Sequence, residues 1–435
     1  MYRKISNDLL SWKNSPYRKP LILQGARQVG KTYSVLEFAD EHYDQVAYVN
    51  FEYAEDARKI FDSNLEPANL IPALEVYTKK NIAKERTLIF FDEIQRCPQA
   101  LTSLKYFCEF APEYHVIAAG SLLGVAVSRE QYSFPVGKVY RLTQYPMDFE
   151  EFLTAAASSE VDAEFPAMIA SHFKTNAPMQ PYYHSHLLEK YRQYLVVGGM
   201  PECVMKFAQT GNYELIRNTQ NLILNDYLDD MSKYNTANEI KKTRLAYSSV
   251  TTQLSKKNTR FQYKLVKSGG RASEFENAIE WLTLSGIVSR VFCVDTIKKP
   301  LENYKNIDKF KIFFSDVGLL CARNNILANE IIYGLDSLND FKGGMTENYV
   351  CTQLIRNGHI CYSWQSDGEA ELDFVINREG GIIPIEVKSA ENAKAKSLRT
   401  YMQRYKPDYA IKISTNNFGF ENDIKTIPLY AAFCL

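Results

Sequence analysis

The stretch KPLILQGARQVGKTYSVLEFAD, Lys19 to Asp40, carries the clearest indication of how this chain folds. It contains the pattern G-x-x-x-x-G-K-[ST] from Gly25 to Thr32, after a short apolar run and before apolar residues at helical spacing. In that context the glycines let backbone N–H groups turn inward around a phosphate, and the helix N-terminus adds partial positive charge. The stretch therefore predicts a phosphate-binding loop between a strand and a helix.

The loop also specifies the ligand. Lys31 is expected to reach the β- and γ-phosphates as part of the catalytic set, and the Thr32 hydroxyl is expected to bind Mg²⁺. We find no Asn-Lys-x-Asp element for guanine, so ATP with Mg²⁺ is the predicted cofactor. The expected nucleotide-binding residues are Gly25, Ala26, Arg27, Gln28, Val29, Gly30, Lys31, Thr32 and Tyr33.

A second stretch, TLIFFDEIQRCP (residues 87–98), is an apolar run that ends in Asp92 and Glu93. This is the form of a buried parallel strand with acids at its carboxyl end. Asp92 is expected to hold Mg²⁺ through water, and Glu93 to orient and polarise the attacking water. A structural pair of buried acids is the alternative.

A third apolar run, YHVIAAGSLLG, ends in Ser121, which could sense the γ-phosphate. Strands expected at 46–51, 88–92 and 115–119 are separated by helical stretches. This alternation predicts a parallel sheet with right-handed crossovers, and so an α/β P-loop ATPase domain.

Length and composition set the remaining limits. With 435 residues, 46% hydrophobic and 23% charged, the chain is expected to be a soluble protein of two or three domains. No segment has the pattern of a signal peptide or of a bilayer span, so no membrane partner is expected. The eight cysteines form no C-x-x-C pair and indicate thiols of a reducing compartment. A cytoplasmic location is therefore predicted.

Five segments resemble AAA-type ATP-binding proteins of bacteria and archaea that carry a conserved C-terminal domain of unknown function. These segments are GARQVGKT, FFDEIQ, AAGSLLG, FPVGKVYRLTQYPMDFEEFL and VVGGMPECV, in order between residues 18 and 205. The resemblance continues more loosely to the C-terminal third. The family usually reads Gly-Arg where this chain has Gly137-Lys138, so an arginine finger would be replaced by Lys138, Arg129 or Arg141. Fingers supplied between subunits would imply a homo-oligomer.

The net charge is zero, but the charge is unevenly distributed. Residues 232–271 contain one acid, Glu239, and ten basic residues: Lys233, Lys241, Lys242, Arg244, Lys256, Lys257, Arg260, Lys264, Lys267 and Arg271. Helices followed by the strand SGIVSRVFCVD have the order that the resembling family implies for a winged helix, a module that can place a helix in DNA. The alternative is a solvated face of an interdomain lid. DNA is thus a predicted partner.

In the C-terminal third, ELDFVINREGGIIPIEVKSA (residues 371–390) predicts a β-hairpin. A turn centred between Glu379 and Gly380 puts Asp373 opposite Glu386, where two like charges are unfavourable. Lys388 then projects from the same face as Glu386.

A bound divalent ion is one explanation of this charge arrangement. Glu347 on a preceding helix, Asp373 on one strand and Glu-x-Lys on the next follow the order of the restriction-endonuclease-like core. Glu347, Asp373, Glu386 and the Val387 carbonyl would be the metal ligands, and Lys388 a catalytic residue acting on water and phosphate. The alternative is a structural salt-bridge network without chemistry.

The expected architecture therefore has three parts. Residues 1–200 form the P-loop parallel-sheet domain, residues 201–305 a helical lid with a winged helix, and residues 306–435 an α/β nuclease-like domain. Two functions remain open at this point: an ATPase acting on DNA through a nuclease-like domain, or an ATP-dependent signalling switch whose C-terminal domain only docks a partner.

Overall fold

The computed structural model describes residues 1–53, 55–62, 64–127, 134–233, 236–255, 260–334, 339–366, 370–389 and 396–435. The chain forms two compact units. Unit 1 consists of Met1–Tyr145 and Leu284–Gly286, and unit 2 of Pro146–Thr283 and Ile287–Leu435. No helix in these ranges is long and apolar enough to cross a membrane.

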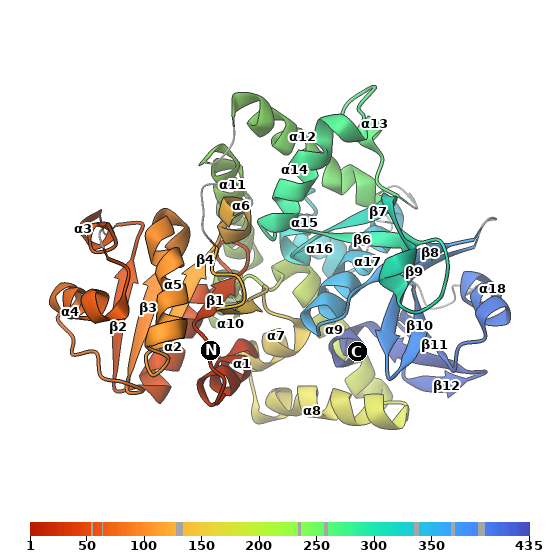
Figure 1. Ribbon diagram of the computed structural model, residues 1–435. Coiled ribbons are helices and arrows are strands. Elements are labelled where there is room, and N and C mark those ends of the chain that lie inside the picture. Colours follow the sequence, from red (N-terminus) through yellow and green to blue (C-terminus); the bar gives the residue numbers. More distant parts are fainter. Residues whose placement is uncertain are drawn as a thin grey trace. The chain divides into compact units, whose positions relative to one another are not determined.

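Unit 1 is built on a five-stranded parallel sheet with the order β2-β3-β4-β1-β5 (Figure 1). Its strands are β1 (Leu21–Gln24), β2 (Gln45–Asn50), β3 (Thr87–Asp92), β4 (His115–Gly120) and β5 (Tyr140–Thr143). Its helices are α1 (Ile5–Lys13), α2 (Lys31–His42), α3 (Glu55–Lys59), α4 (Pro67–Thr78), α5 (Pro98–Phe110) and α6 (Leu123–Val127), with a 3₁₀ turn η1 (Ile94–Arg96). The predicted α/β class and parallel sheet are confirmed.

Helices cover both faces of this sheet, which explains its near-continuous apolar strands. On one face Leu23 and Phe90 pack with Phe38 of α2 and with α1. On the other face Ile89 and Phe91 pack with residues of α4 and α5. Because side chains alternate along a strand, each of the strands β1 to β4 contributes to both cores.

Unit 2 contains an eight-stranded mixed sheet with the order β12-β13-β11-β10-β9-β8-β6-β7. Its strands are β6 (Val288–Val294), β7 (Lys305–Phe314), β8 (Tyr362–Gln365), β9 (Glu371–Arg378), β10 (Gly381–Val387), β11 (Ala410–Ser414), β12 (Gly419–Glu421) and β13 (Ile424–Pro428). Its helices are α7 (Phe149–Ala155), α8 (Glu160–Thr175), α9 (Pro181–Val197), α10 (Pro201–Thr210), α11 (Tyr213–Lys233), α12 (Ala237–Ser255), α13 (Tyr263–Val266), α14 (Ala272–Leu284), α15 (Val317–Arg323), α16 (Ala328–Ile332), α17 (Asn339–Arg356) and α18 (Lys396–Tyr405). Two 3₁₀ segments, η2 (Leu301–Tyr304) and η4 (Leu429–Cys434), complete it.

The observed division differs from the expected three parts at two places. Residues 146–200 lie in unit 2, where Phe149 N–H donates to Oε1 of Gln353 (3.1 Å) and Lys425 Nζ donates to the Phe173 carbonyl (2.8 Å). The expected boundary at residue 305 falls between β6 and β7, which pair with each other in one sheet. Because β6 also pairs with β8, the β6–β7 hairpin belongs to the same sheet as the C-terminal strands. The expected middle and C-terminal parts are therefore joined.

Candidate nucleotide site and carboxylate cluster

The phosphate-binding loop connects β1 to α2, as predicted. Gly25 has φ of 147°, and a Cβ built on it would lie 2.1 Å from the Gln144 carbonyl oxygen, so a side chain does not fit there. Gly30, at φ of 87°, precedes α2 and supplies no side-chain cap, which leaves the helix N-terminus to backbone N–H groups. The loop therefore has the close packing and the turn that a phosphate cradle requires.

The loop is held from behind by residues that no sequence motif indicates. The Val29 carbonyl accepts hydrogen bonds from Arg3 Nη1 and from Gln144 Nε2, both at 2.9 Å. Gln144 Nε2 also donates to Ser34 Oγ at 2.9 Å. Arg3 and Gln144 are buried, and a buried polar side chain needs such partners. These contacts hold the loop in one conformation.

Two loop side chains have polar partners within unit 1. Lys31 Nζ folds back to the carbonyl oxygens of Gly25 (3.0 Å) and Ala26 (2.8 Å). The Thr32 hydroxyl donates to Asp92 Oδ2 at 2.8 Å. The threonine of the loop and the last residue of the acidic strand thus meet, which is the arrangement that a Mg²⁺ ion between them requires.

The acidic strand end is further organised by its neighbours. Asp92 Oδ2 accepts a 3.0 Å hydrogen bond from Tyr48 OH, and burial, with smaller contributions from Asp92 and Glu93, raises the pKa of Tyr48 to about 12. Asn50 Nδ2 donates to Tyr48 OH at 3.1 Å. Tyr48 and Asn50 lie on β2, beside β3, and no motif in the sequence identified them.

Glu93 stands in a left-handed conformation, with φ of 51°, directly after β3. Gln95 Nε2 donates a short hydrogen bond to Glu93 Oε2. Backbone strain of this kind is common at active sites, where it holds a side chain in one orientation. Ser121 is buried and follows β4, the strand between β1 and β3. It therefore lies at the same sheet edge as the phosphate loop and Asp92.

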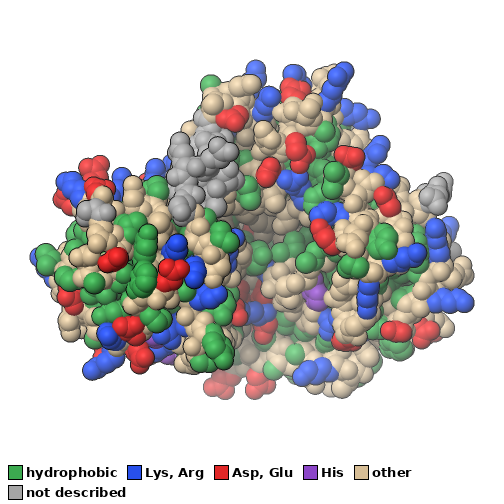
Figure 2. All heavy atoms as spheres, in the orientation of Figure 1, with side chains coloured by type: hydrophobic (Ala, Val, Ile, Leu, Met, Phe, Trp, Pro, Cys, Tyr) green, Lys and Arg blue, Asp and Glu red, His purple; other side chains and the backbone are tan. Residues whose placement is uncertain are grey.

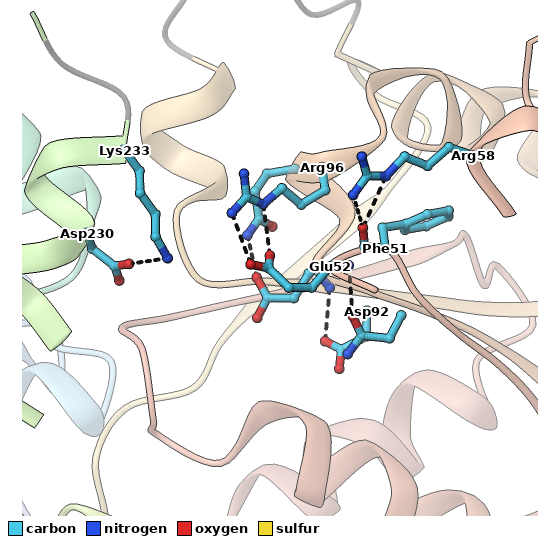
Figure 3. Close-up of polar contacts among 10 residues, drawn as sticks. Phe51, Glu52, Arg58, Asp92, Arg96, Asp230 and Lys233 are labelled. Atoms are coloured by element: carbon cyan, nitrogen blue, oxygen red, sulfur yellow. Dashed lines mark hydrogen bonds and ion pairs between the residues drawn. The ribbon is translucent and has the colours of Figure 1, made fainter. Parts of the chain in front are cut away.

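An ion pair links the loops that follow β2 and β3 (Figure 3). Arg96 contacts both carboxylate oxygens of Glu52, at 2.8 and 3.1 Å. Phe51 N–H donates to the Asp92 carbonyl at 3.0 Å, while Arg58 bonds the Phe51 carbonyl. A bidentate arginine contact fixes orientation as well as distance.

The expected finger candidates have different surroundings. Lys138 forms a 2.9 Å ion pair with Glu109, which raises the pKa of Lys138 and lowers that of Glu109. The Arg141 guanidinium lies 4.1 Å from the centre of the Phe134 ring. Arg129 lies outside the described residues.

In unit 2, the predicted hairpin forms with its predicted register. Glu379 and Gly380 both have positive φ, at 50° and 77°, as a tight two-residue turn demands. Pro384 pairs with Val375, so it causes no shift, and the ladder ends one step before Asp373 and Glu386. Asp373 Oδ2 accepts a 2.8 Å hydrogen bond from Val387 N–H.

The polar side chains there form a cluster that includes an unpredicted cation. We call this set the carboxylate cluster: Glu347, Glu371, Asp373, Glu386, Lys311 and Lys388. Lys311 Nζ lies 2.8 Å from Glu371, 3.4 Å from Glu347 and 3.9 Å from Asp373. Lys388 Nζ lies 2.7 Å from Glu386 Oε1.

Burial governs protonation in the cluster. It raises the pKa of Glu347 to about 7, although Lys311 opposes the rise. Burial also raises the pKa of Glu386, whose Oε2 has no hydrogen-bond partner in the described part of the chain.

The expected metal site at Glu347, Asp373 and Glu386 is not assembled. Within the described ranges, no three His, Cys, Asp or Glu side chains are grouped so that they could hold a metal ion. The physical reason is Lys311, whose ammonium stands among three of the cluster's carboxylates. The metal site at these residues, and the metal-dependent catalytic role of Lys388, stay predictions. A lysine inside the apolar run FKIFF (residues 310–314) was the signal that could have revealed this cation, because a buried charge needs partners.

The basic segment is partly used internally. Lys233 pairs with Asp230, Lys267 with Glu274, and Arg244 donates to Ser232 Oγ. Lys256 and Lys257 lie outside the described residues. The exposed members with no ion pair to another described residue are Lys241, Arg244, Arg260, Lys264 and Arg271. Figure 2 shows basic side chains, with acidic ones among them, on the part of unit 2 that carries α12 to α14.

The aromatic residues of the basic segment belong to the core. Phe261 is buried and stacks on Phe310, with ring centres 5.4 Å apart. Tyr263 OH donates to Glu276 at 3.0 Å. The Phe261 ring is therefore not free to stack on bases.

Comparisons with known families cover most of the chain. Residues 17–153 match the model of an AAA domain, residues 188–330 a domain of unknown function (DUF8612), and residues 342–432 a second one (DUF4143). Among curated proteins, none matches. Most of unit 1 thus matches an AAA domain.

Solved structures with a similar arrangement are distant. A Walker-type ATPase of Pyrococcus abyssi is 14% identical, with a TM-score of 0.44 over 74% of this chain and 95% of that one. The ORC1 protein of Aeropyrum pernix, solved with DNA, is 13% identical, with a TM-score of 0.30 over 76% and 92%. Cdc6p of Pyrobaculum aerophilum is 12% identical, with a TM-score of 0.25 over 76% and 93%. Likenesses this weak carry no argument about function.

Proposed function

We propose that unit 1 binds ATP with Mg²⁺ and hydrolyses it. The observation that carries this proposal is the hydrogen bond from Thr32 to Asp92 beside a glycine loop closed by Lys31. Mg²⁺ would be held at the Thr32 hydroxyl and near Asp92, and it would neutralise charge on the β- and γ-phosphates when bound. Lys31 would leave its two carbonyl partners for the phosphate oxygens.

In this proposal Glu93 positions and polarises the attacking water, and Ser121 contacts the γ-phosphate. Gln95, which now bonds Glu93 Oε2, must release that oxygen or turn with it before the carboxylate can accept the water proton. Hydrolysis would thus depend on a small rearrangement of the turn after β3. That dependence is what makes an ATPase usable as a switch.

Nucleotide binding is the test. Lys31→Ala should abolish binding of a fluorescent ATP analogue in Mg²⁺, because no other group in the loop supplies an ammonium to the phosphates. Lys80→Ala changes an exposed lysine of the same unit and should bind like the parent. Equal binding by Lys31→Ala and the parent would refute the proposed site.

For unit 2 we propose a restriction-endonuclease-like fold that contacts DNA without a metal-dependent cut. The element order α17-β8-β9-β10-α18-β11, with β9 and β10 antiparallel and β10 and β11 parallel, supports the fold. Three helices, α12 to α14, followed by the β6–β7 hairpin support a winged-helix arrangement, and its exposed cations could bind phosphates.

The second candidate is a signalling switch in which unit 2 docks a protein. The ion pairs inside the carboxylate cluster favour it, because they leave the cluster without evident chemistry. The two candidates separate in one assay: duplex DNA should stimulate ATP turnover if DNA is the partner. DNA-insensitive turnover would favour the docking function.

We also propose that the chain self-associates, so that a basic finger residue of one copy contacts the nucleotide bound by another. Lys138 and Arg141 lie near β5 on the P-loop unit, and a finger from a second copy would complete the phosphate site. Turnover per chain should then rise with protein concentration. Constant turnover over a wide concentration range would exclude a finger supplied by another subunit.

A further inference from the structure

The carboxylate cluster has one feature that no motif in the chain anticipates, the position of Lys311. Its side chain, on β7, is only 11% exposed, and its ammonium is within ion-pair distance of carboxylates from two other elements. Glu347 comes from α17, and Glu371 and Asp373 from β9. One cation therefore joins a strand at the edge of the sheet, a helix and an inner strand.

This geometry is that of a small cation within a carboxylate cage. An ammonium group has three donors and a single positive charge, and here three carboxylates surround it. The shortest of these contacts, 2.8 Å to Glu371, is an ion pair between two groups of opposite charge. A divalent ion at the same place would meet this charge at close range.

The other half of the cluster has its own cation. Lys388 bonds Glu386, and Asp373 uses its second oxygen for the Val387 N–H. This hydrogen bond ties the backbone N–H of Val387, the residue whose carbonyl is the expected ligand, to the Asp373 carboxylate. Both Asp373 oxygens and Glu386 Oε1 thus have partners within the chain, whereas Glu386 Oε2 has none among the described residues.

We infer that Lys311 is the resident cation of the carboxylate cluster and takes the place of a divalent metal ion. The inference rests on the proposed nuclease-like arrangement of unit 2 and extends it: the cluster is a fixed internal ion network that excludes divalent metals. Unit 2 then keeps the shape of a nuclease core while its cluster stabilises the junction of β7, β9 and α17.

Calorimetry with Mn²⁺ alone tests this on the full chain. Asp92→Asn is the background, so that the P-loop contributes no carboxylate to a metal. We expect no saturable Mn²⁺ binding with Lys311 present. Lys311→Met should gain a saturable Mn²⁺ site. Its affinity should exceed any weak Mn²⁺ binding by the parent about ten- to hundredfold, the range over which neighbours of metal ligands change affinity.

The control is Lys309→Met, on the same strand, where the lysine that is replaced pairs loosely with Asp295 at 3.7 Å. It should bind no Mn²⁺. Lys311→Arg keeps the charge and should also bind none, and circular dichroism of all variants reports folding. If Lys311→Met does not fold, Mn²⁺ titration of the Lys311 protein still decides, because saturable binding that Asp373→Asn abolishes contradicts the inference.

The inference would be overturned if the protein with Lys311 bound Mn²⁺ saturably and Asp373→Asn abolished that binding. A folded Lys311→Met protein that gains no Mn²⁺ site would also overturn it. Neither outcome depends on ATP turnover, because the background already lacks the Asp92 carboxylate. A failure of the proposed ATPase would therefore leave the Mn²⁺ results unchanged.

Discussion

The hydroxyl of Thr32 and the carboxylate of Asp92 are 2.8 Å apart although β4 separates the strands that lead to them. The contact reaches across one strand end at the carboxyl edge of the sheet. It fixes the distance between the two groups before any ligand enters.

Removing that hydroxyl should weaken Mg²⁺-dependent nucleotide binding. Thr32→Ala deletes a hydrogen bond to a charged group, worth about 1.5–3 kcal/mol, and an oxygen available to Mg²⁺. Thr32→Ser keeps the hydroxyl and should bind almost as the parent does. Titration of Mg²⁺ against bound ATP analogue measures both. Equal Mg²⁺ dependence of the two variants would count against a metal role for Thr32.

Glu93→Gln should bind ATP normally and hydrolyse it slowly, by a factor of about 10²–10⁴, since the amide cannot accept a proton. Gln95→Ala removes the hydrogen bond to Glu93 and should change turnover while leaving binding intact. Phosphate release under single-turnover conditions measures both. Unchanged turnover in Glu93→Gln would remove that residue from its assigned role.

DNA binding should fall steeply with salt if the exposed cations bind phosphates. Reversing Lys241, Lys264 and Arg271 to glutamate should reduce the slope of log affinity against log salt by about 0.9 for each phosphate that is no longer neutralised. A control reverses Lys59, Lys80 and Lys84, exposed lysines of unit 1. An unchanged slope in the first set would show that the segment is a solvated face.

The P-loop position could be predicted because its chemistry is local: a glycine loop, a lysine and a threonine are adjacent in the chain. The acids after β3 could be predicted because parallel strands end at one edge. Gln144 could not, because it lies more than a hundred residues from the loop that it supports and has no motif of its own. Its role follows from the side-chain hydrogen bonds to Val29 and Ser34 and from the close approach of its backbone to Gly25.

The hairpin register could also be predicted, because a two-residue turn fixes all later pairs. The residues that surround the hairpin could not be predicted. Lys311 lies 62 residues before Asp373, and β7 reaches the cluster only because β6 pairs with β8. Such non-local pairing decides whether a set of carboxylates meets a metal or an ammonium.

Acid should destabilise unit 1 through His115. Burial, aided by Arg18 and Lys13, lowers the pKa of His115 to about 4, and its Nδ1 contacts Tyr43 OH at 2.7 Å. Because the unfolded chain binds the proton more readily, stability present above pH 6.5 is lost as pH falls toward 4, by about 3 kcal/mol. When the pH is lowered, the β4 amides of His115→Phe should lose less of their protection against hydrogen exchange than those of the parent. Identical pH dependence would reject this assignment.

Glu347 should act in the opposite direction. Its pKa, raised to about 7, means that the folded state binds a proton more readily, so the stability it contributes below pH 4.5 is lost as pH rises through 7. Glu347→Gln, which stays neutral, should therefore be more stable than the parent at pH 8, by up to about 3 kcal/mol, and equal to it near pH 4.5. Urea unfolding of unit 2 at both pH values checks this. A less stable variant at pH 8 would contradict it.

The β6–β7 pairing contains an irregularity that determines where related sequences can accept insertions. Phe292 pairs with Phe310, but the next residue, Cys293, pairs with Asn306, so residues 307–309 bulge from the ladder. Length changes in that bulge would leave the pairing of Lys311 with Val291 untouched. A single insertion between Phe310 and Phe314 would turn Lys311 to the opposite face of the sheet and strip the cluster of its cation. Natural insertions in this hairpin should therefore gather at the bulge and spare the five residues after it.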